Sequence, residues 1–100
     1  MEKAETKGGR LTHYKVKKPA MHNVVMHNDD VTTMDFVVMV LQRVFHKSAE
    51  EAEVLMMKVH NEGAAIVGTY YRDIAESKAN YAMMLAGMSG YPLKVTTEEA

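Results

Sequence analysis

Hydrophobic and polar positions first form a regular pattern close to Pro19. Residues 21–26 contain the β-branched pair Val24 and Val25, which favours an extended strand. The run Asn28-Asp29-Asp30 follows directly, and Asn and Asp are typical turn residues. We therefore predict a strand that ends just before this run.

Two amphipathic helices are predicted to follow the first strand. Each starts at a hydroxyl residue with an acidic residue three positions later, which is the spacing of a capping box. The two pairs are Thr32 with Asp35 and Ser48 with Glu51. Apolar residues recur with helical period after each pair, so we expect one helix to about Phe45 and a second to about His60, with Gly63 as its stop.

The last third of the chain predicts a strand, a helix and a strand. Residues 65–70 are short, apolar and partly β-branched, and Gly68 within them indicates a bulge or a close backbone approach. Asp73 is expected to cap a third helix, and Gly87 to end it. Residues 92–95 then alternate as a final strand, with a proline at its first position.

The element order βααβαβ predicts an α/β fold, a two-layer sandwich of a three-stranded sheet and three helices. Each helix has one apolar stripe, which it must bury against another layer. With 100 residues, the chain is long enough for one core. Residues 1–18 are polar and basic, so we expect a flexible N-terminal tail there and a folded domain at 19–100.

Composition narrows the function classes. The net charge is -1 with a pI of about 6.5, so we expect no nucleic-acid or membrane partner. Cys is absent, which removes disulfides and thiolate chemistry. No apolar run reaches the length of a membrane span, and the start of the chain lacks the apolar stretch of a signal peptide. We therefore expect a cytoplasmic protein.

Four polar residues predict a site for a charged amine. An amide oxygen, a carboxylate and an imidazole nitrogen can each accept a hydrogen bond from an ammonium group, and the carboxylate adds opposite charge. Asn28, Asp29, Asp30 and His60 supply these groups. They can meet only if the end of the first strand lies beside the end of the second helix. Taken alone, the run is an ordinary turn and His60 an ordinary helix-end histidine.

Catalysis and metal binding are not expected. The chain has no recognisable pairing of a nucleophile with a base, so we predict a protein that is not an enzyme and needs no cofactor. Its five His residues lack the paired spacing of a helical metal site. A calcium loop starting at Asp29 fails as well, because Thr32 and Thr33 replace required positions.

Three sequence pieces together resemble the ClpS family, adaptors that deliver substrates to AAA+ proteases. They are Asn-Asp-Asp at 28–30, Thr-x-Met-x-Phe-Val at 32–37 and Val-His-x-x-Gly-x-Ala at 59–65, and Gly68 follows them. The resemblance runs from about Pro19 to the C-terminus. It implies that residues 19–100 are a substrate-recognition domain. The expected ligand is the free N-terminal residue of an N-degron protein, namely Phe, Tyr, Trp or Leu.

The resemblance also implies roles for particular residues. Asn28, Asp30 and His60 would hold the α-amino group, with Asp29 shaping the turn. The implied pocket for the first side chain consists of Met26, Thr32, Met34, Val37, Met56, Val59 and Leu93. Met34 would crowd the pocket mouth and exclude β-branched residues.

The implied partner is the N-terminal domain of a ClpA or ClpC type unfoldase. Asp73 and Lys78 would contact it, and the tail 1–18 would be engaged during delivery. Two positions depart from the family pattern, since His27 replaces an aliphatic residue and Thr33 replaces a common Pro. The alternative is a small ribosome-associated or scaffold domain that uses its third helix for interaction and ignores free amino termini.

Overall fold

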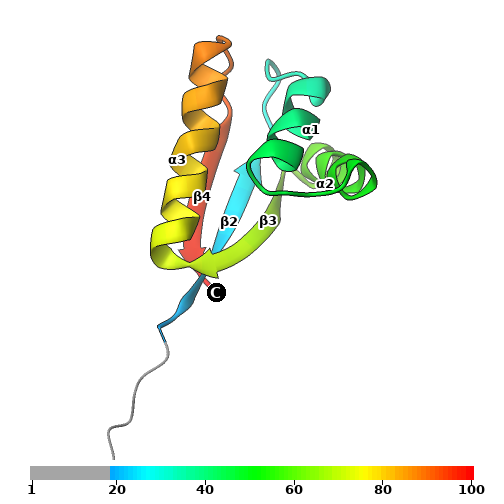
Figure 1. The fold of residues 1–100 in the computed structure, drawn as a ribbon. Helices are drawn as coiled ribbons and strands as arrows, with labels where there is room; N and C mark the ends of the chain where they lie inside the picture. Colours follow the sequence, from blue (N-terminus) through cyan, green and yellow to red (C-terminus); the bar gives the residue numbers. More distant parts are fainter. Residues whose placement is uncertain (1–18) are drawn as a thin grey trace, which may run out of the picture.

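The computed structural model describes residues 19–100, in which three strands and three helices form a two-layer domain (Figure 1). In chain order the elements are β2 (Met21–His27), α1 (Met34–Arg43), α2 (Ala49–Glu62), β3 (Ala64–Tyr71), α3 (Arg72–Met88) and β4 (Lys94–Glu99). This confirms the predicted order βααβαβ. The tail expected at 1–18 lies outside the described residues.

The sheet is antiparallel, with strand order β3-β2-β4 and β2 in the centre. Met26 pairs with Ala65 on one side and with Val95 on the other, and all three side chains are buried. Because side chains alternate along a strand, the neighbouring Val25 and His27 face the opposite side of the sheet. One face of the sheet therefore carries the core, and the other is partly exposed.

The helices cover the buried face in two groups. Helix α3 lies along β4 and β2, whereas α1 packs on α2 and α2 packs on β3 (Figure 1). The stripe that α3 turns inward consists of alanines at helical spacing. These are Ala75, Ala79, Ala82 and Ala86. Small side chains let the helix approach the sheet closely, and the larger apolar side chains of β2, α1 and β4 fill the remaining core.

The N-terminal cap of α1 differs from the prediction by one residue. Thr33, not Thr32, is the cap, and its hydroxyl oxygen accepts a hydrogen bond from the Phe36 N–H at 3.2 Å. Helix α1 also ends at Arg43, two residues before the predicted end at Phe45. The hydroxyl of Thr32 is engaged by a different residue, as described below.

The capping box of α2 is confirmed. The Ser48 N–H donates to Glu51 Oε1 at 2.9 Å, and the Glu51 N–H donates to Ser48 Oγ at 3.1 Å. The hydrogen bonds from Ser48 lower the pKa of the Glu51 carboxyl from its ordinary value. The helix runs to Glu62, slightly beyond the predicted end near His60, and Gly63 follows as the predicted stop.

Several predicted boundaries in the last third of the chain are wrong. Tyr71 occupies the cap position of α3 without a side-chain hydrogen bond, and Asp73 lies in the first turn instead of capping it. The helix continues through Gly87 to Met88, because its preceding turn is still buried on the sheet. Strand β4 starts at Lys94, so Pro92 precedes it.

A bulge in β3 confirms the prediction for Gly68. Val24 pairs with Gly68 whereas Val25 pairs with Ile66, so Val67 is the extra residue. A Cβ at Gly68 would lie 2.6 Å from the Tyr70 side chain, which explains why a residue without a side chain stands there.

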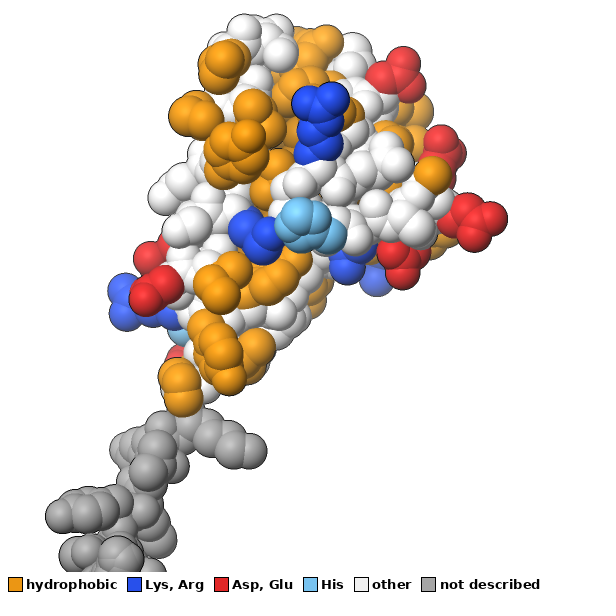
Figure 2. Space-filling model, in the orientation of Figure 1, with side chains coloured by type: hydrophobic (Ala, Val, Ile, Leu, Met, Phe, Trp, Pro, Cys, Tyr) orange, Lys and Arg blue, Asp and Glu red, His pale blue; other side chains and the backbone are white. Residues whose placement is uncertain are grey.

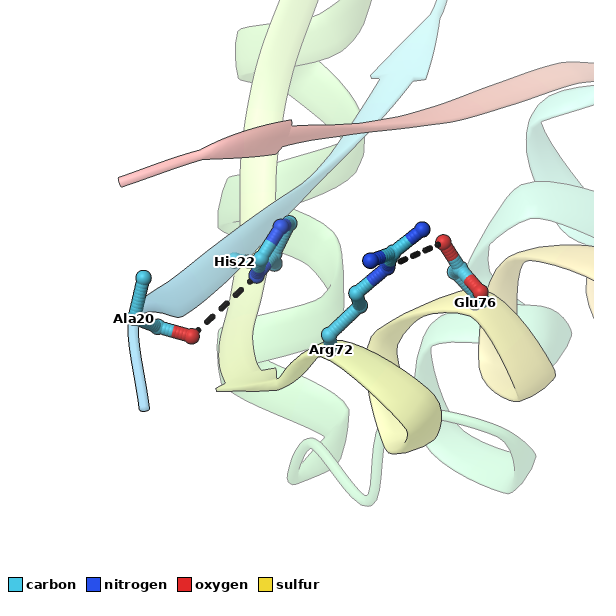
Figure 3. A network of polar contacts seen from close by, with 4 residues as sticks. All are labelled: Ala20, His22, Arg72 and Glu76. Atoms are coloured by element: carbon cyan, nitrogen blue, oxygen red, sulfur yellow. Dashed lines mark hydrogen bonds and ion pairs between the residues drawn. The ribbon is translucent and has the colours of Figure 1, made fainter. Parts of the chain in front are cut away.

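Near the start of β2 and the start of α3, exposed polar contacts join residues that are close in sequence (Figure 3). Arg72 Nε donates to Glu76 Oε2 at 3.2 Å within the first turns of α3. His22 Nδ1 lies 3.2 Å from the carbonyl oxygen of Ala20. An exposed ion pair of this kind contributes little to stability.

Candidate functional site

A cavity of about 480 Å³ lies where the end of β2, the start of α1 and the C-terminal part of α2 meet. This volume falls within the range of ordinary small-ligand sites. Its lining is polar where the turn after β2 forms the wall and largely apolar where the helices do. The lining residues are Asn28, Asp29, Asp30, Val31, Thr32, Thr33, Met34, Val37, Met56, Val59 and His60.

The end of β2 is tied to the end of α2 by the backbone. The Asn28 N–H donates to the Gly63 carbonyl oxygen at 2.9 Å. Gly63 has φ 87°, a left-handed conformation that glycine adopts without strain, and its N–H donates to the Val59 carbonyl at 3.0 Å. Helix α2 therefore ends abruptly, and its last turn brings His60 to the same cavity as Asn28.

Asp29 organises the turn between β2 and α1. Its Oδ1 accepts hydrogen bonds from the Val31 N–H at 2.8 Å and the Thr32 N–H at 2.7 Å. Its Oδ2 accepts one from the Thr32 hydroxyl at 2.7 Å. Partial burial acts to raise the pKa of Asp29, but the hydrogen bonds from Thr32 and Val31 outweigh it, so this pKa lies below its ordinary value.

The start of α1 is anchored to the segment before β4. The Thr33 hydroxyl, besides capping the helix, lies 3.5 Å from the Tyr91 hydroxyl. The rings of Phe36 and Tyr91 are 4.9 Å apart between centroids and tilted by 60°. These contacts fix the first turn of α1, and Met34, the first residue of this turn, lines the cavity.

Three polar side chains of the cavity keep acceptor atoms available. Within residues 19–100, the side chains of Asn28, Asp30 and His60 take part in no hydrogen bond with another side chain or with the backbone. All three are exposed. An amide oxygen, a carboxylate and an imidazole nitrogen thus line one cavity. These groups can accept hydrogen bonds from a cation that carries N–H groups.

The apolar part of the cavity comes from the two helices. Met34 and Val37 of α1, together with Met56 and Val59 of α2, line it. Thr32 of the predicted pocket also lines the cavity, from the turn before α1, whereas Met26 and Leu93 lie elsewhere. Met26 is 0% exposed and Leu93 is 5% exposed, and neither lines the cavity. Both are core residues, so any influence they have on a ligand passes through the packing of the cavity wall.

Sequence reasoning left two lining residues unassigned. Val31 and Thr33 line the cavity because they lie in the turn between Asp30 and Met34. Their position in this short segment, between residues already predicted to line the site, could have identified them from the sequence. His27, in contrast, lies on the exposed face of the sheet, where its Nε2 is 2.8 Å from Thr96 Oγ1, and it does not line the cavity.

A second surface lies on α3, where the two residues predicted to contact an unfoldase are found. Asp73 is exposed in the first turn. Lys78 Nζ donates to the Val44 carbonyl at 2.7 Å and lies 5.3 Å from the centroid of the Tyr70 ring. Apolar side chains gather over α3 around this region (Figure 2). The exposed apolar residues of α3 are Ile74, Tyr81, Met84 and Met88.

The fold and the cavity define a small binding domain with one mixed polar and apolar site. The family model described as ATP-dependent Clp protease adaptor protein ClpS matches residues 17–96. The chain therefore belongs to the ClpS family of Clp protease adaptor proteins.

Curated relatives cover most of the chain. The ATP-dependent Clp protease adapter protein ClpS of Lawsonia intracellularis is 43% identical over 89 residues, 89% of this chain and 82% of that protein. The ClpS adapter of Desulforapulum autotrophicum is 48% identical over 92 residues, 88% of both chains. The ClpS adapter of Vibrio atlanticus is 51% identical over 85 residues, 85% of this chain and 80% of that one.

A solved structure confirms the fold assignment. Agrobacterium tumefaciens ClpS2 bound to L-phenylalaninamide superposes with a TM-score of 0.81 at 41% sequence identity, covering 83% of this chain and 100% of that chain. No helix among residues 19–100 is long and apolar enough to cross a membrane. In the same part of the chain, no three His, Asp or Glu side chains are placed to hold a metal ion.

Proposed function

We propose that the cavity binds the free N-terminal residue of N-degron proteins and that the chain delivers these proteins to a Clp AAA+ protease. One observation carries this proposal: three acceptor side chains that have no hydrogen-bond partner among residues 19–100, and an apolar helix wall, line the same cavity of about 480 Å³. The first residue of a protein has two features that match these walls. Its ammonium group and its side chain are both attached to the same carbon atom, Cα.

The polar wall would take the α-amino group. Asn28 and His60 each supply a neutral acceptor, and Asp30 supplies an acceptor with negative charge. Asp29 contributes indirectly, because its own oxygens already accept three hydrogen bonds within the turn. Hydrogen bonds to a charged group typically contribute about 1.5–3 kcal/mol. An acetylated amine has no positive charge and fewer N–H groups, so it loses most of this interaction.

The apolar wall would take the first side chain. Phe, Tyr, Trp and Leu have large side chains that would contact the apolar lining residues Val37, Met56 and Val59. Burying such a side chain contributes roughly 1.5–3 kcal/mol. The ligand in the solved relative supports this assignment, since L-phenylalaninamide has a free amine, a benzyl side chain and an uncharged amide in place of a carboxylate. It thus has the chemistry of the first residue of a peptide.

Membership of an adaptor family supports a binding role in preference to catalysis. On this proposal, the N-terminal domain of a ClpA or ClpC type unfoldase docks on the surface that contains Asp73 and Lys78. That surface is on α3, so an adaptor could hold a substrate and an unfoldase at the same time. The alternative from the sequence is a scaffold domain without amine recognition. That alternative does not explain why acceptor side chains line the cavity.

Two peptides that begin with Phe test the proposal. They have the same sequence and a fluorophore at the C-terminal end, but one has a free amine and the other is acetylated. We expect the first to bind and the second to lose at least about 10-fold in affinity, which corresponds to 1.4 kcal/mol. Equal affinity for the two peptides, or binding of neither, contradicts the proposal.

A further inference from the structure

We propose that Met34 is a modification site, at which oxidation of the thioether to a sulfoxide lowers the affinity of the cavity for an apolar side chain. This inference rests on the proposed function, because it concerns the apolar part of the same cavity. It adds a chemical control that neither the fold nor the family assignment contains.

Among the described methionines, Met34 both lines the cavity and is well exposed to solvent. Its side chain lines the cavity and is 44% exposed. Met56 also lines the cavity but is only 8% exposed, so little of this residue is accessible. Met88 is 77% exposed and Met57 is 40% exposed, but neither lines the cavity. A dissolved oxidant can therefore reach one cavity methionine directly in the folded protein.

Oxidation of Met34 needs an oxidant, and a peroxide is the co-reactant that supplies the oxygen atom. The Met34 sulfur attacks one peroxide oxygen and forms the S–O bond, and the O–O bond breaks. The sulfur is oxidised by two electrons, and hydrogen peroxide is reduced to water. The product is a polar sulfoxide, which methionine sulfoxide reductases convert back to the thioether.

The two hydroxyl groups next to Met34 in the sequence are already engaged. The hydroxyl of Thr32 already donates to Asp29 Oδ2 at 2.7 Å, and that of Thr33 is directed to the Tyr91 hydroxyl at 3.5 Å. A sulfoxide oxygen would therefore keep its hydrogen bonds to water, and an entering apolar side chain would have to displace that water. From the penalty for burying an unpaired polar group, we expect a loss of roughly 3- to 30-fold in affinity.

The test treats the full chain with hydrogen peroxide and follows two quantities. Peptide-mapping mass spectrometry gives the extent of oxidation at each methionine, and fluorescence anisotropy gives the affinity for a labelled peptide that begins with Phe and has a free amine. We expect affinity to fall as Met34 is oxidised and to recover after treatment with methionine sulfoxide reductases. If Met34 stays reduced while Met88 is oxidised, or if the fully oxidised chain binds as before, the inference is wrong.

Two variants separate Met34 from the other methionines. Met34→Leu and Met57→Leu each replace the thioether by a side chain of similar volume that peroxide does not oxidise. Each protein is compared with its own affinity before peroxide. The affinity of Met34→Leu should be insensitive to peroxide although its Met57 and Met88 are oxidised, and that of Met57→Leu should fall like the wild type. An equal fall in both variants overturns the inference.

The outcome also distinguishes this inference from the proposed function. If the untreated chain does not bind the free-amine peptide, the proposed function fails. If the untreated chain binds and oxidation of Met34 leaves the affinity unchanged, only the role of Met34 as a modification site fails.

Discussion

Asp29 and Thr32 are joined twice, because both the N–H and the hydroxyl of Thr32 donate to the Asp29 carboxylate at 2.7 Å. This pair closes the turn between β2 and α1. The side chains of Asn28 and Asp30, on either side of Asp29, line the cavity and have no hydrogen-bond partner in the described part of the chain, although the three residues are adjacent in sequence. One acidic residue shapes the site, and its neighbour is available to a ligand.

Stability and binding should separate in the variants Asp29→Asn and Asp30→Asn. An amide at position 29 cannot accept all three hydrogen bonds, so we expect Asp29→Asn to lower the free energy of unfolding by about 1–2 kcal/mol. Asp30 makes no such bonds to the residues that the structure describes, and Asp30→Asn should change stability by less than about 0.5 kcal/mol. Urea unfolding measures both values. Asp30→Asn should nevertheless lose roughly 10-fold or more in affinity for a free-amine peptide. Unaltered affinity in Asp30→Asn would exclude it as an amine ligand.

The turn should also make stability depend on acid. The pKa of Asp29 in the folded chain lies below its ordinary value of 3.8, so the ionised carboxylate is favoured by folding. Its contribution is complete above pH 3.8 and is lost as the pH falls through the folded-state pKa. The difference in unfolding free energy between wild type and Asp29→Asn should therefore shrink below that pH. Urea unfolding between pH 6 and pH 2.5 measures it, and a constant difference argues against this role.

Two glycine substitutions should have opposite effects on stability. Gly63 has φ 87°, and a side chain is strained in that conformation even though no atom lies within 4 Å of an added Cβ. We expect Gly63→Ala to destabilise the chain by about 1–2 kcal/mol. Gly87 lies within α3 and also has open space around it, so Gly87→Ala should stabilise by roughly 0.4–1 kcal/mol. Thermal or urea unfolding measures the change in stability of each variant. A change of the same sign in both variants would contradict the assignment of backbone strain to Gly63.

Met34→Ala should widen the range of accepted first residues. Met34 lines the cavity and begins α1, so removing its side chain gives a branched Cβ more room. We expect peptides that start with Ile or Val to gain at least about 5-fold in affinity, close to 1 kcal/mol. A peptide array that varies only the first residue measures this. Met57→Ala serves as the control, because Met57 does not line the cavity. If Ile and Val peptides bind Met34→Ala no better than wild type, Met34 does not exclude β-branched residues.

Unfoldase binding should be lost without loss of peptide binding in Asp73→Lys. Asp73 is exposed and does not line the cavity, so the reversed charge should leave the fold and the peptide affinity intact. We expect at least about 10-fold weaker binding to the N-terminal domain of the unfoldase, measured by calorimetry. Asp30→Asn should show the converse, with normal unfoldase binding and weak peptide binding. Normal unfoldase binding by Asp73→Lys would move the interface away from the start of α3.

Local sequence signals were sufficient for the element order and for one helix start. Ser48 and Glu51 form their capping box within four residues, so no distant contact is needed to predict it. Local patterns place Asn28 at a strand end and His60 at a helix end but do not bring the two ends together, so their joint location was expected only from the resemblance to the ClpS family.

A competing side-chain contact and a long-range strand pairing decided the boundaries that sequence reasoning missed. Thr32 has the spacing of a cap, but Asp29 engages its hydroxyl, so the cap passes to Thr33. Strand β4 extends to Glu99, well beyond the predicted end at Val95, because it pairs with β2 along its whole length. Such pairing joins segments about seventy residues apart, and no local pattern encodes it.

The place where an aromatic amine binds tests the central claim most directly. In an NMR titration of the isotopically labelled chain with L-phenylalaninamide, backbone amide shifts should concentrate at residues 28–34, at 56–60 and at Gly63, which surround the cavity. N-acetyl-L-phenylalaninamide should leave these signals almost unchanged at equal concentration. Shifts confined to α3 and the end of α1, or equal shifts with both compounds, would contradict an amine-binding site between β2 and α2.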